Sequence, residues 1–477
     1  MGIEKEIYYS SLCHKTIKLH MTEKTIILNG ARFEDKHLDS INTLLTDEIH
    51  KHHGGRVRTF MLRDIKIKPC TGCFNCWIKT PGRCIHADAG PDILREILNS
   101  DTVILFTPVV FGGYSSELKK IADRFLPIVL PFFRKIHGET HHPPRYSKFP
   151  RFIGLGVSPH PRKELSHCFK TLVGRNALNL PPSYYTYIAE VLDSTESSKV
   201  LREQLRNLLF RKDKLPLREK FTLSIQNTSS ELEVWTGSRK ALLVTGSQKT
   251  GQTSTSAVLG KNLLGRLKKH GWATETLKLT ENLLREERLC DLYSAVDRAD
   301  TILIAFPLYF DTLPFMMTKL FEIIACHRKK VKNSRPKRII AVVNNALPEA
   351  HQNMVALAVC RNFAMECGMS WAGSLAMGSG EALVSGQSLT GFTGFKGLKR
   401  PPLYYVVRAL NMTAAALAEG HPVPEKAAQL IAKKPVPCIP FNLWRWMYIK
   451  IAKRLWEKAA FKNGLNRKEM LGRPYVK

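Results

Sequence analysis

Two stretches of the chain repeat one hydrophobic pattern. Segments 101–112 and 300–311 align without a gap, and each contains an apolar run of strand length that ends at Pro108 or Pro307. An aromatic-containing loop follows in both copies, and then a pattern of helical period at 118–126 and 317–324. Such self-similarity indicates that the chain contains two related units. Each unit is predicted to contain a strand, a proline loop and a helix.

Further apolar runs surround each copy. Runs that close on glycine precede the copies at 24–30 and 240–246, and others follow at 152–158 and 338–346. Continuously apolar strands that alternate with helical segments are typical of parallel sheets covered on both faces. The pattern therefore predicts an α/β fold with two tandem doubly wound parallel sheets.

Changes in polarity suggest the domain boundaries. We expect an N-terminal extension (1–23), a first domain (24–192), a polar linker with one helical segment (193–239), a second domain (240–440), and a basic C-terminal helix and tail (441–477). The interval from Gly30 to Asp101 is 17 residues longer than that from Gly246 to Asp300. This excess equals the length of the cysteine-rich segment 70–86, which we therefore expect to be an insertion in the first domain.

Composition narrows the class of protein. The apolar fraction of 44% and the charged fraction of 24% are near the averages for globular proteins. No apolar run approaches the ~18 residues of a membrane span, and the start lacks the apolar core of a signal peptide. The eleven cysteines are scattered except for one group of four, which favours reduced thiols or a metal site over a disulfide framework. We expect a cytoplasmic protein without a membrane span.

The formal net charge of +31 is unusual for a chain of 477 residues. Nucleic acid, an anionic membrane surface or a phosphate-bearing cofactor would each suit it. The sequence has no zinc-finger spacing, no aromatic RNA-binding motif and no basic zipper, so we expect no specific nucleic-acid partner.

A candidate phosphate loop follows the first strand of the second domain. Residues 246–254, Gly-Ser-Gln-Lys-Thr-Gly-Gln-Thr-Ser, lead into a helical pattern, where hydroxyls and backbone N–H groups can hold a phosphate. The same residue types also mark an ordinary loop and helix N-cap. The equivalent loop of the first domain has lost most hydroxyls and carries Glu34, Asp35 and Asp39, so we expect it to bind phosphate poorly.

The two proline loops are predicted at the carboxyl ends of central strands, where ligands of open α/β sheets bind. A planar ring could rest against Phe111 in one copy and against Tyr309 and Phe310 in the other. Packing of the same rings beneath the next helix is an equal alternative. His137, His141 and His142 could bind a metal on a helix, but Gly138 and the following prolines favour a surface loop.

These motifs resemble the NAD(P)H-dependent FMN reductases of the flavodoxin-like superfamily, which include the iron-sulfur flavoproteins. The resemblance rests on 70–84 and 107–124 in the first half, and on 246–254, 306–310, 344–352, 360–371 and 376–386 in the second half. It extends to the C-terminal segment 456–475. It implies two tandem flavodoxin-like domains that form an internal pseudo-dimer. It also favours packing of 441–461 on the second domain over its alternative, a position on an anionic membrane.

The resemblance implies a flavin site in the second domain. Ser247, Thr253 and Ser254 would hold the FMN phosphate, and the isoalloxazine would lie against Pro307, Leu308, Tyr309, Phe310, Asn344 and Asn345. The family's chemistry is hydride transfer from NAD(P)H to FMN without a catalytic side chain, followed by transfer to an acceptor that the sequence does not identify. A non-catalytic electron carrier or partner-binding protein is the alternative. A membrane- or nucleic-acid-associated module is a third hypothesis.

Four cysteines form the most specific local motif, Cys70-x2-Cys73-x2-Cys76-x7-Cys84. Three thiolates at three-residue steps and a fourth nearby can face one cluster. The iron-sulfur flavoproteins carry a compact cysteine motif at this place, with a shorter last gap, so the resemblance suggests a [4Fe-4S] cluster. A zinc site, a dithiol/disulfide pair and inert thiols are the alternatives.

Overall fold

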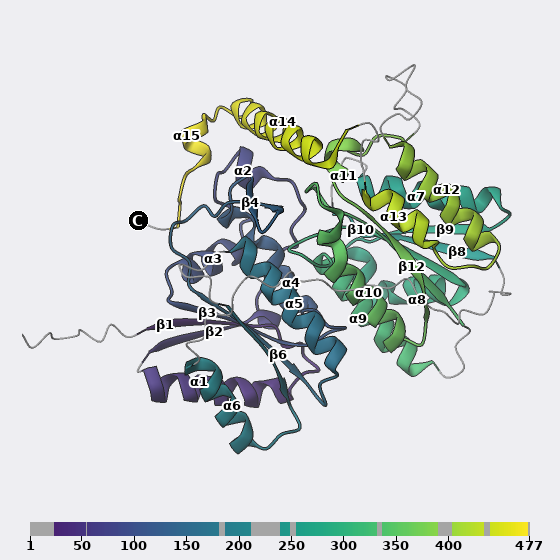
Figure 1. Ribbon diagram of the computed structural model, residues 1–477. Helices are drawn as coiled ribbons and strands as arrows, with labels where there is room; N and C mark the ends of the chain where they lie inside the picture. Colours follow the sequence, from purple (N-terminus) through teal and green to yellow (C-terminus); the bar gives the residue numbers. More distant parts are fainter. Residues whose placement is uncertain are drawn as a thin grey trace, which may run out of the picture.

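The structure is a computed structural model that describes residues 23–53, 55–180, 187–210, 239–248, 254–331, 336–389, 403–433 and 439–475. Its two large units are a first domain, up to residue 210, and a second domain from residue 239 to residue 433 (Figure 1).

Each domain contains a parallel five-stranded sheet. In the first domain the spatial order is β2-β1-β3-β6-β7, with β1 Lys24–Asn29, β2 Arg56–Met61, β3 Thr102–Pro108, β6 Arg151–Ser158 and β7 Tyr187–Asp193. In the second domain it is β9-β8-β10-β11-β12, with β8 Lys240–Thr245, β9 Ala273–Lys278, β10 Thr301–Pro307, β11 Arg338–Asn344 and β12 Ser370–Met377. Read from the first strand of each domain, both orders are 2-1-3-4-5, the flavodoxin order. The prediction of two tandem flavodoxin-like α/β domains is confirmed.

Helices cover both faces of the first sheet. One face carries α1 (His37–His53) and α6 (Ser198–Phe210), and the other carries α3 (Gly90–Leu98), α4 (Ser116–Ala122), the 3-10 helix η2 (Asp123–Ile128) and α5 (Lys163–Asn179). Helix α6 falls within the segment expected to be a linker. Its leucines Leu201, Leu205 and Leu208 are buried in one core cluster with α1, so this helix is part of the first domain.

The second sheet is covered in the same way. Its outer face carries α7 (Thr255–Lys269), α12 (Tyr404–Ala418) and α13 (Glu425–Lys433), and the short helix α11 (Gly380–Leu383) follows β12. Its inner face carries α8 (Leu289–Arg298), α9 (Phe315–Lys330) and α10 (Met354–Glu366). Short 3-10 helices lie at Leu62–Asp64, Asn282–Leu284, Glu286–Arg288 and Ala350–Asn353.

The two domains pack through equivalent helices. Helix α4 lies against α9, α5 lies against α10, and one hydrophobic cluster continues across the contact. The backbone N–H of Ser116 donates to Glu322 (2.8 Å), and the backbone N–H of Phe315 donates to Asp123 (2.7 Å). In the gapless alignment of the repeat, Ser116 corresponds to Phe315 and Asp123 to Glu322. The same bond is therefore made twice, once in each direction.

Three further pieces lie at one end of this contact. They are α2 (Asn75–Ile78) in the cysteine segment, the hairpin of β4 (Arg134–Ile136) and β5 (Glu139–His141), and α14 (Phe441–Phe461) followed by α15 (Arg467–Met470). Figure 1 shows α14, in yellow, running from α11 of the second domain to α2 of the first. The segment packs on the second domain, as expected, through Trp444 and Tyr448, and it also contacts α2 of the first domain, so α14 bridges both.

The C-terminal tail ends on the first domain. Arg145 is buried there, and its guanidinium donates to the carbonyl oxygens of Met470 (2.7 Å) and Gly472 (2.9 Å). Within the described ranges, no helix has both the length and the apolar character needed to cross a membrane.

Candidate functional site

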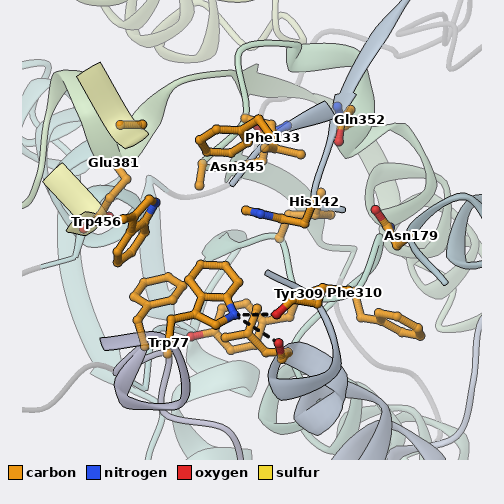
Figure 2. A pocket seen from close by; sticks show the side chains of 18 of the residues that line it. Trp77, Phe133, His142, Asn179, Tyr309, Phe310, Asn345, Gln352, Glu381 and Trp456 are labelled. Atoms are coloured by element: carbon orange, nitrogen blue, oxygen red, sulfur yellow. Dashed lines mark hydrogen bonds between the residues drawn. The ribbon is translucent and has the colours of Figure 1, made fainter. Parts of the chain in front are cut away.

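A cavity of about 570 Å³ lies where the loops after β10, β11 and β12 face the first domain (Figure 2). Its volume is within the range of small-molecule and cofactor sites. The second domain contributes Leu308, Tyr309, Phe310, Asn345 and Glu381, and helix α14 contributes Trp444, Tyr448, Leu455 and Trp456. The first domain contributes Ala122, Asp123, Trp77 and His142. The site is therefore composite, and it lies at the edge of the sheet where doubly wound folds bind ligands.

The loop after β10 is held in an unusual conformation by the first domain. Phe310 and Asp311 have φ values of 46° and 59°, in the left-handed region that costs non-glycine residues energy. The Asp311 carboxylate accepts hydrogen bonds from Asn176 (3.0 Å) and Asn179 (2.7 Å), and it pairs with Arg175 (3.3 Å). These three residues belong to α5, so contacts between the domains offset the strain of the loop.

A buried ion pair supports the same loop from beneath. Lys119 and Asp123 are both buried, and their charged atoms lie 2.5 Å apart. The Lys119 ammonium also donates to the backbone oxygen of Tyr309 (2.9 Å). Burial lowers the pKa of Lys119 and raises that of Asp123. Gly72 closes the site from the cysteine segment at φ +64°, and a side chain there would overlap the Tyr309 hydroxyl.

Asn345 offers an unsatisfied acceptor at the cavity wall. Its side-chain nitrogen donates to the backbone oxygen of Glu349 (2.8 Å), and this bond sets the orientation of the amide because a carbonyl can only accept. The other end, Oδ1, is buried and has no hydrogen-bond partner in the described part of the chain. Buried polar atoms without a partner are rare and suggest a ligand or ordered water. Asn344 and Pro307 end β11 and β10, and they are not among the lining residues.

His142 is a cavity residue that sequence reasoning missed. The predicted surface loop is instead a hairpin, His141 is fully buried, and His142 lies between the rings of Trp77 (4.8 Å) and Phe133 (5.0 Å). Its Nδ1 lies 3.0 Å from the carbonyl oxygens of Leu130 and Phe132, so this nitrogen carries the proton.

Burial lowers the pKa of His142 to about 4. The ring is therefore neutral near pH 7, with Nε2 as an acceptor. The histidine pattern contained no signal for this role, because the role depends on Trp77 and Phe133 from other parts of the chain.

Aromatic rings form the rest of the wall. Trp456 of α14 packs edge-on against Phe74 (5.1 Å) and Trp77 (5.2 Å). The Trp77 indole N–H is directed away, to the backbone oxygens of Leu126 (3.1 Å) and Val129 (3.0 Å), as the dashed lines in Figure 2 show. Its ring face is thus fixed. Flat aromatic walls of this kind suit a planar ligand.

The four predicted cysteines lie around one small cavity of about 20 Å³ beside the large one. Cys70 lines both cavities. Burial raises the pKa of Cys70 to about 12 and that of Cys76 well above its ordinary value. Across the described residues, no group of three or more His, Cys, Asp or Glu side chains is arranged to hold a metal ion.

Of the two loops expected to differ in phosphate binding, the second is described only at residues 246–248 and 254. In the second domain Ser247 is buried, Ser254 caps α7 by accepting from the Ala257 N–H (3.2 Å), and Thr253 lies outside the described residues. In the first domain Asp35 accepts from the backbone N–H of Arg32 (3.0 Å) and from its guanidinium (2.7 Å). An internal carboxylate thus already occupies the first loop.

Comparison with known proteins gives a family match for the first domain. Residues 25–138 match the model of the NADPH-dependent FMN reductase family. The first domain is therefore similar to this FMN reductase family, and the match covers residues 25–138 alone. Iron-sulfur flavoproteins of Methanocaldococcus jannaschii and Archaeoglobus fulgidus are 39% identical over 71 residues and 34% identical over 77 residues. These alignments cover 15% and 16% of this chain, and the chain spans only 36% and 34% of the two relatives.

Some solved structures are also similar to part of this chain. An NAD(P)H:quinone oxidoreductase from Methanothermobacter marburgensis is 9% identical at a TM-score of 0.28, with 38% of this chain and 96% of that chain covered. An FMN-dependent NADH-azoreductase from Bacillus anthracis is 12% identical at a TM-score of 0.26, with 38% and 99% covered.

Proposed function

We propose that the chain is a flavin-dependent oxidoreductase that binds one FMN in the composite cavity and passes electrons from NAD(P)H to an acceptor. The observation that carries the proposal is the aromatic-walled cavity at the carboxyl ends of β10, β11 and β12, together with the unpartnered Asn345 Oδ1. A flat ring with an N–H group matches both features, and the isoalloxazine of FMN is such a ring. The FMN reductase match of the first domain supports the same cofactor.

The residues present fit this cofactor. Asn345 Oδ1 would accept a hydrogen bond from a ring N–H, and the loop Pro307, Leu308, Tyr309 and Phe310 would support the ring with Asn344 behind it. Ser247, Thr253 and Ser254 would hold the phosphate at the start of α7. When bound, FMN supplies the hydride-transfer chemistry, while the protein provides position and electrostatics. His142 Nε2 would accept a hydrogen bond from the ring or from a second ligand stacked on it.

We infer that the two domains act as an internal pseudo-dimer around a single site. The reciprocal bonds of Ser116 and Phe315 support this arrangement, and so does the composite cavity, which needs Trp77 and His142 from the first domain. The cysteine segment would then serve the flavin site of the other domain.

For the four cysteines we propose a [4Fe-4S] cluster next to the flavin, on the basis of their common position and of the iron-sulfur flavoprotein relatives. Because the described side chains are not arranged to hold a metal, binding of the cluster would require them to move apart. Iron and acid-labile sulfide in the anaerobically purified chain test this, with Cys73→Ser and Cys84→Ser as variants. Iron that disappears in both variants supports the cluster. A chain purified without iron, or zinc found in place of iron, contradicts it.

The visible spectrum of the purified full chain, followed by anaerobic addition of NADH or NADPH, tests the main proposal. We expect a flavin spectrum that bleaches when the nicotinamide is added. A colourless chain that takes up no added FMN would contradict the proposal. A flavin spectrum that neither nucleotide bleaches would favour the electron carrier instead.

A further inference from the structure

Helix α14 carries a concentration of exposed apolar side chains. Leu443, Trp446, Ile451, Leu455 and Phe461 are between 47% and 78% exposed within 21 residues. The other large exposed apolar side chains of the described residues are scattered singly over both domains and the C-terminal tail. Isolated cases are ordinary, whereas a cluster of this kind marks an interaction surface.

The folded chain does not need this exposed surface for its own packing. The inward contacts of α14 are made by Trp444, whose indole donates to Ser379 (3.0 Å), by Tyr448, whose hydroxyl donates to the backbone oxygen of Ala346, and by Trp456. At helical spacing, Leu443, Trp446 and Phe461 lie on the opposite side of the helix.

The same outer surface is basic. On this surface α14 carries Lys450, Lys453, Arg454 and Lys458, whereas Arg445 faces inward, 3.6 Å from Glu349. The only acidic residue of the helix, Glu457, pairs with Arg467 (3.4 Å). The Lys450 ammonium lies 3.8 Å from the centre of the Trp446 ring. A tryptophan with a lysine beside it is suited to the boundary between a lipid headgroup layer and water.

We propose that α14 docks the protein on an anionic membrane surface. Helices that combine Trp, Leu and Phe with Lys and Arg lie in the plane of the interface, and anionic lipids attract their basic residues. A second copy of this chain fits less well, because it would bring the same basic helix and a net charge of +31 to the contact. Ile451 and Leu455 are exposed but line the large cavity, so they lie toward the inward side of the helix, and the docking surface consists of Leu443, Trp446 and Phe461 with the neighbouring basic residues.

Cosedimentation of the full chain with phosphatidylcholine vesicles, with or without phosphatidylglycerol, tests this inference. We expect binding only to the anionic vesicles, and weaker binding as salt rises. Lys450→Gln with Arg454→Gln should weaken binding roughly 25-fold, at about fivefold for each basic residue removed. Trp446→Ser should weaken it about tenfold through the loss of buried apolar area.

Lys261→Gln with Lys268→Gln is the matched control, because it removes two exposed lysines from α7. This pair should bind like the unchanged chain. Equal weakening by the control pair, no binding to anionic vesicles, or a dimer that Trp446→Ser converts to a monomer would each overturn the inference. Flavin content measured on the same samples separates this result from the flavin proposal, because vesicle binding does not require FMN.

Discussion

The proline loops of the two domains have the same backbone conformation but different surroundings. Phe111 and Phe310 are equivalent positions with φ values of 53° and 46°, and each loop closes on itself, through Val110 with Gly113 and through Tyr309 with Thr312. Phe111 is buried in solid packing, whereas the loop of Phe310 lines the large cavity. The same loop therefore serves as core in one copy and as a binding surface in the other.

One exchange of size across the domain contact accounts for much of this difference. The Phe111 ring packs against Phe363 (5.3 Å) and Phe321 (6.3 Å). The repeat places Ala122 at the position equivalent to Phe321, and Ala122 lines the large cavity. A phenylalanine on the second domain fills one site, whereas in the other the Phe310 ring packs against Phe125 (5.3 Å) and Ala122 leaves space beside it. The two halves therefore differ at this contact although their sheets have the same strand order.

The strongest way to break this asymmetry is Ala122→Phe, which copies the filled site into the open one. The ring should occupy the space proposed for the isoalloxazine and weaken FMN binding at least a hundredfold, measured as flavin retained after purification and gel filtration. Ala122→Ser is the size-matched control and should keep its flavin. A phenylalanine variant that holds flavin as well as the control would show that the ligand site lies elsewhere.

The reverse exchange, Phe321→Ala, should lower the stability of the protein without changing its affinity for FMN. Removing a buried phenylalanine leaves a cavity and typically lowers the free energy of unfolding by about 3–5 kcal/mol. Urea unfolding of the flavin-free chain measures this loss. A cost below about 1 kcal/mol would mean that the aromatic packing around Phe111 does not stabilise the domain contact.

The ion pair beneath Tyr309 also differs between the copies, because Glu322, the equivalent of Asp123, has the partly exposed Lys319 at 3.9 Å in place of a fully buried lysine. Lys119 corresponds to Thr318, whose hydroxyl donates to the Pro314 carbonyl (3.3 Å). Lys119→Met would leave Asp123 buried without its cation, at a cost of about 3 kcal/mol. Thr318→Val, the matched change in the other copy, should cost about 1 kcal/mol. If urea unfolding showed that the two substitutions lower the free energy of unfolding equally, the ion pair beneath Tyr309 would have no special role.

The smallest effect is a pH dependence that originates at His142. Its pKa falls from 6.5 to about 4 on burial, so the unfolded chain binds more protons than the folded chain between these values. The contribution to stability is fully present above pH 6.5 and is lost as the pH falls toward 4, by about 2 kcal/mol after allowance for the part of the ring that the cavity exposes. His142→Phe should remove this part of the acid sensitivity. An unchanged dependence of urea stability on pH would place its origin at other groups.

The fold could be predicted from the sequence because parallel strands buried on both faces appear as continuous apolar runs, such as 102–107 and 301–306. The composite site could be predicted only in part. Tyr309, Phe310 and Asn345 follow strand ends, where the topology itself indicates a ligand. Ala122, Trp77 and His142 gain their roles from packing between the domains. A pattern along the sequence does not reveal which residues of the two domains meet.

The C-terminal helix illustrates the same limit. Its mixture of tryptophan and basic residues left two interpretations, packing or a membrane surface, because a helix can use opposite faces for both. The structure assigns Trp444, Tyr448 and Trp456 to packing and leaves Trp446 exposed. Only the position of each residue around the helix separates the two roles.

The central proposal is that the cavity beside the proline loop of the second domain binds one FMN, whereas the equivalent position in the first domain is filled by protein side chains. Titration of the flavin-free full chain with FMN, followed by fluorescence quenching, tests it most directly. The account predicts saturation at one FMN per chain, and loss of this site in Ala122→Phe. Saturation at two FMN per chain, or no binding at all, would contradict it.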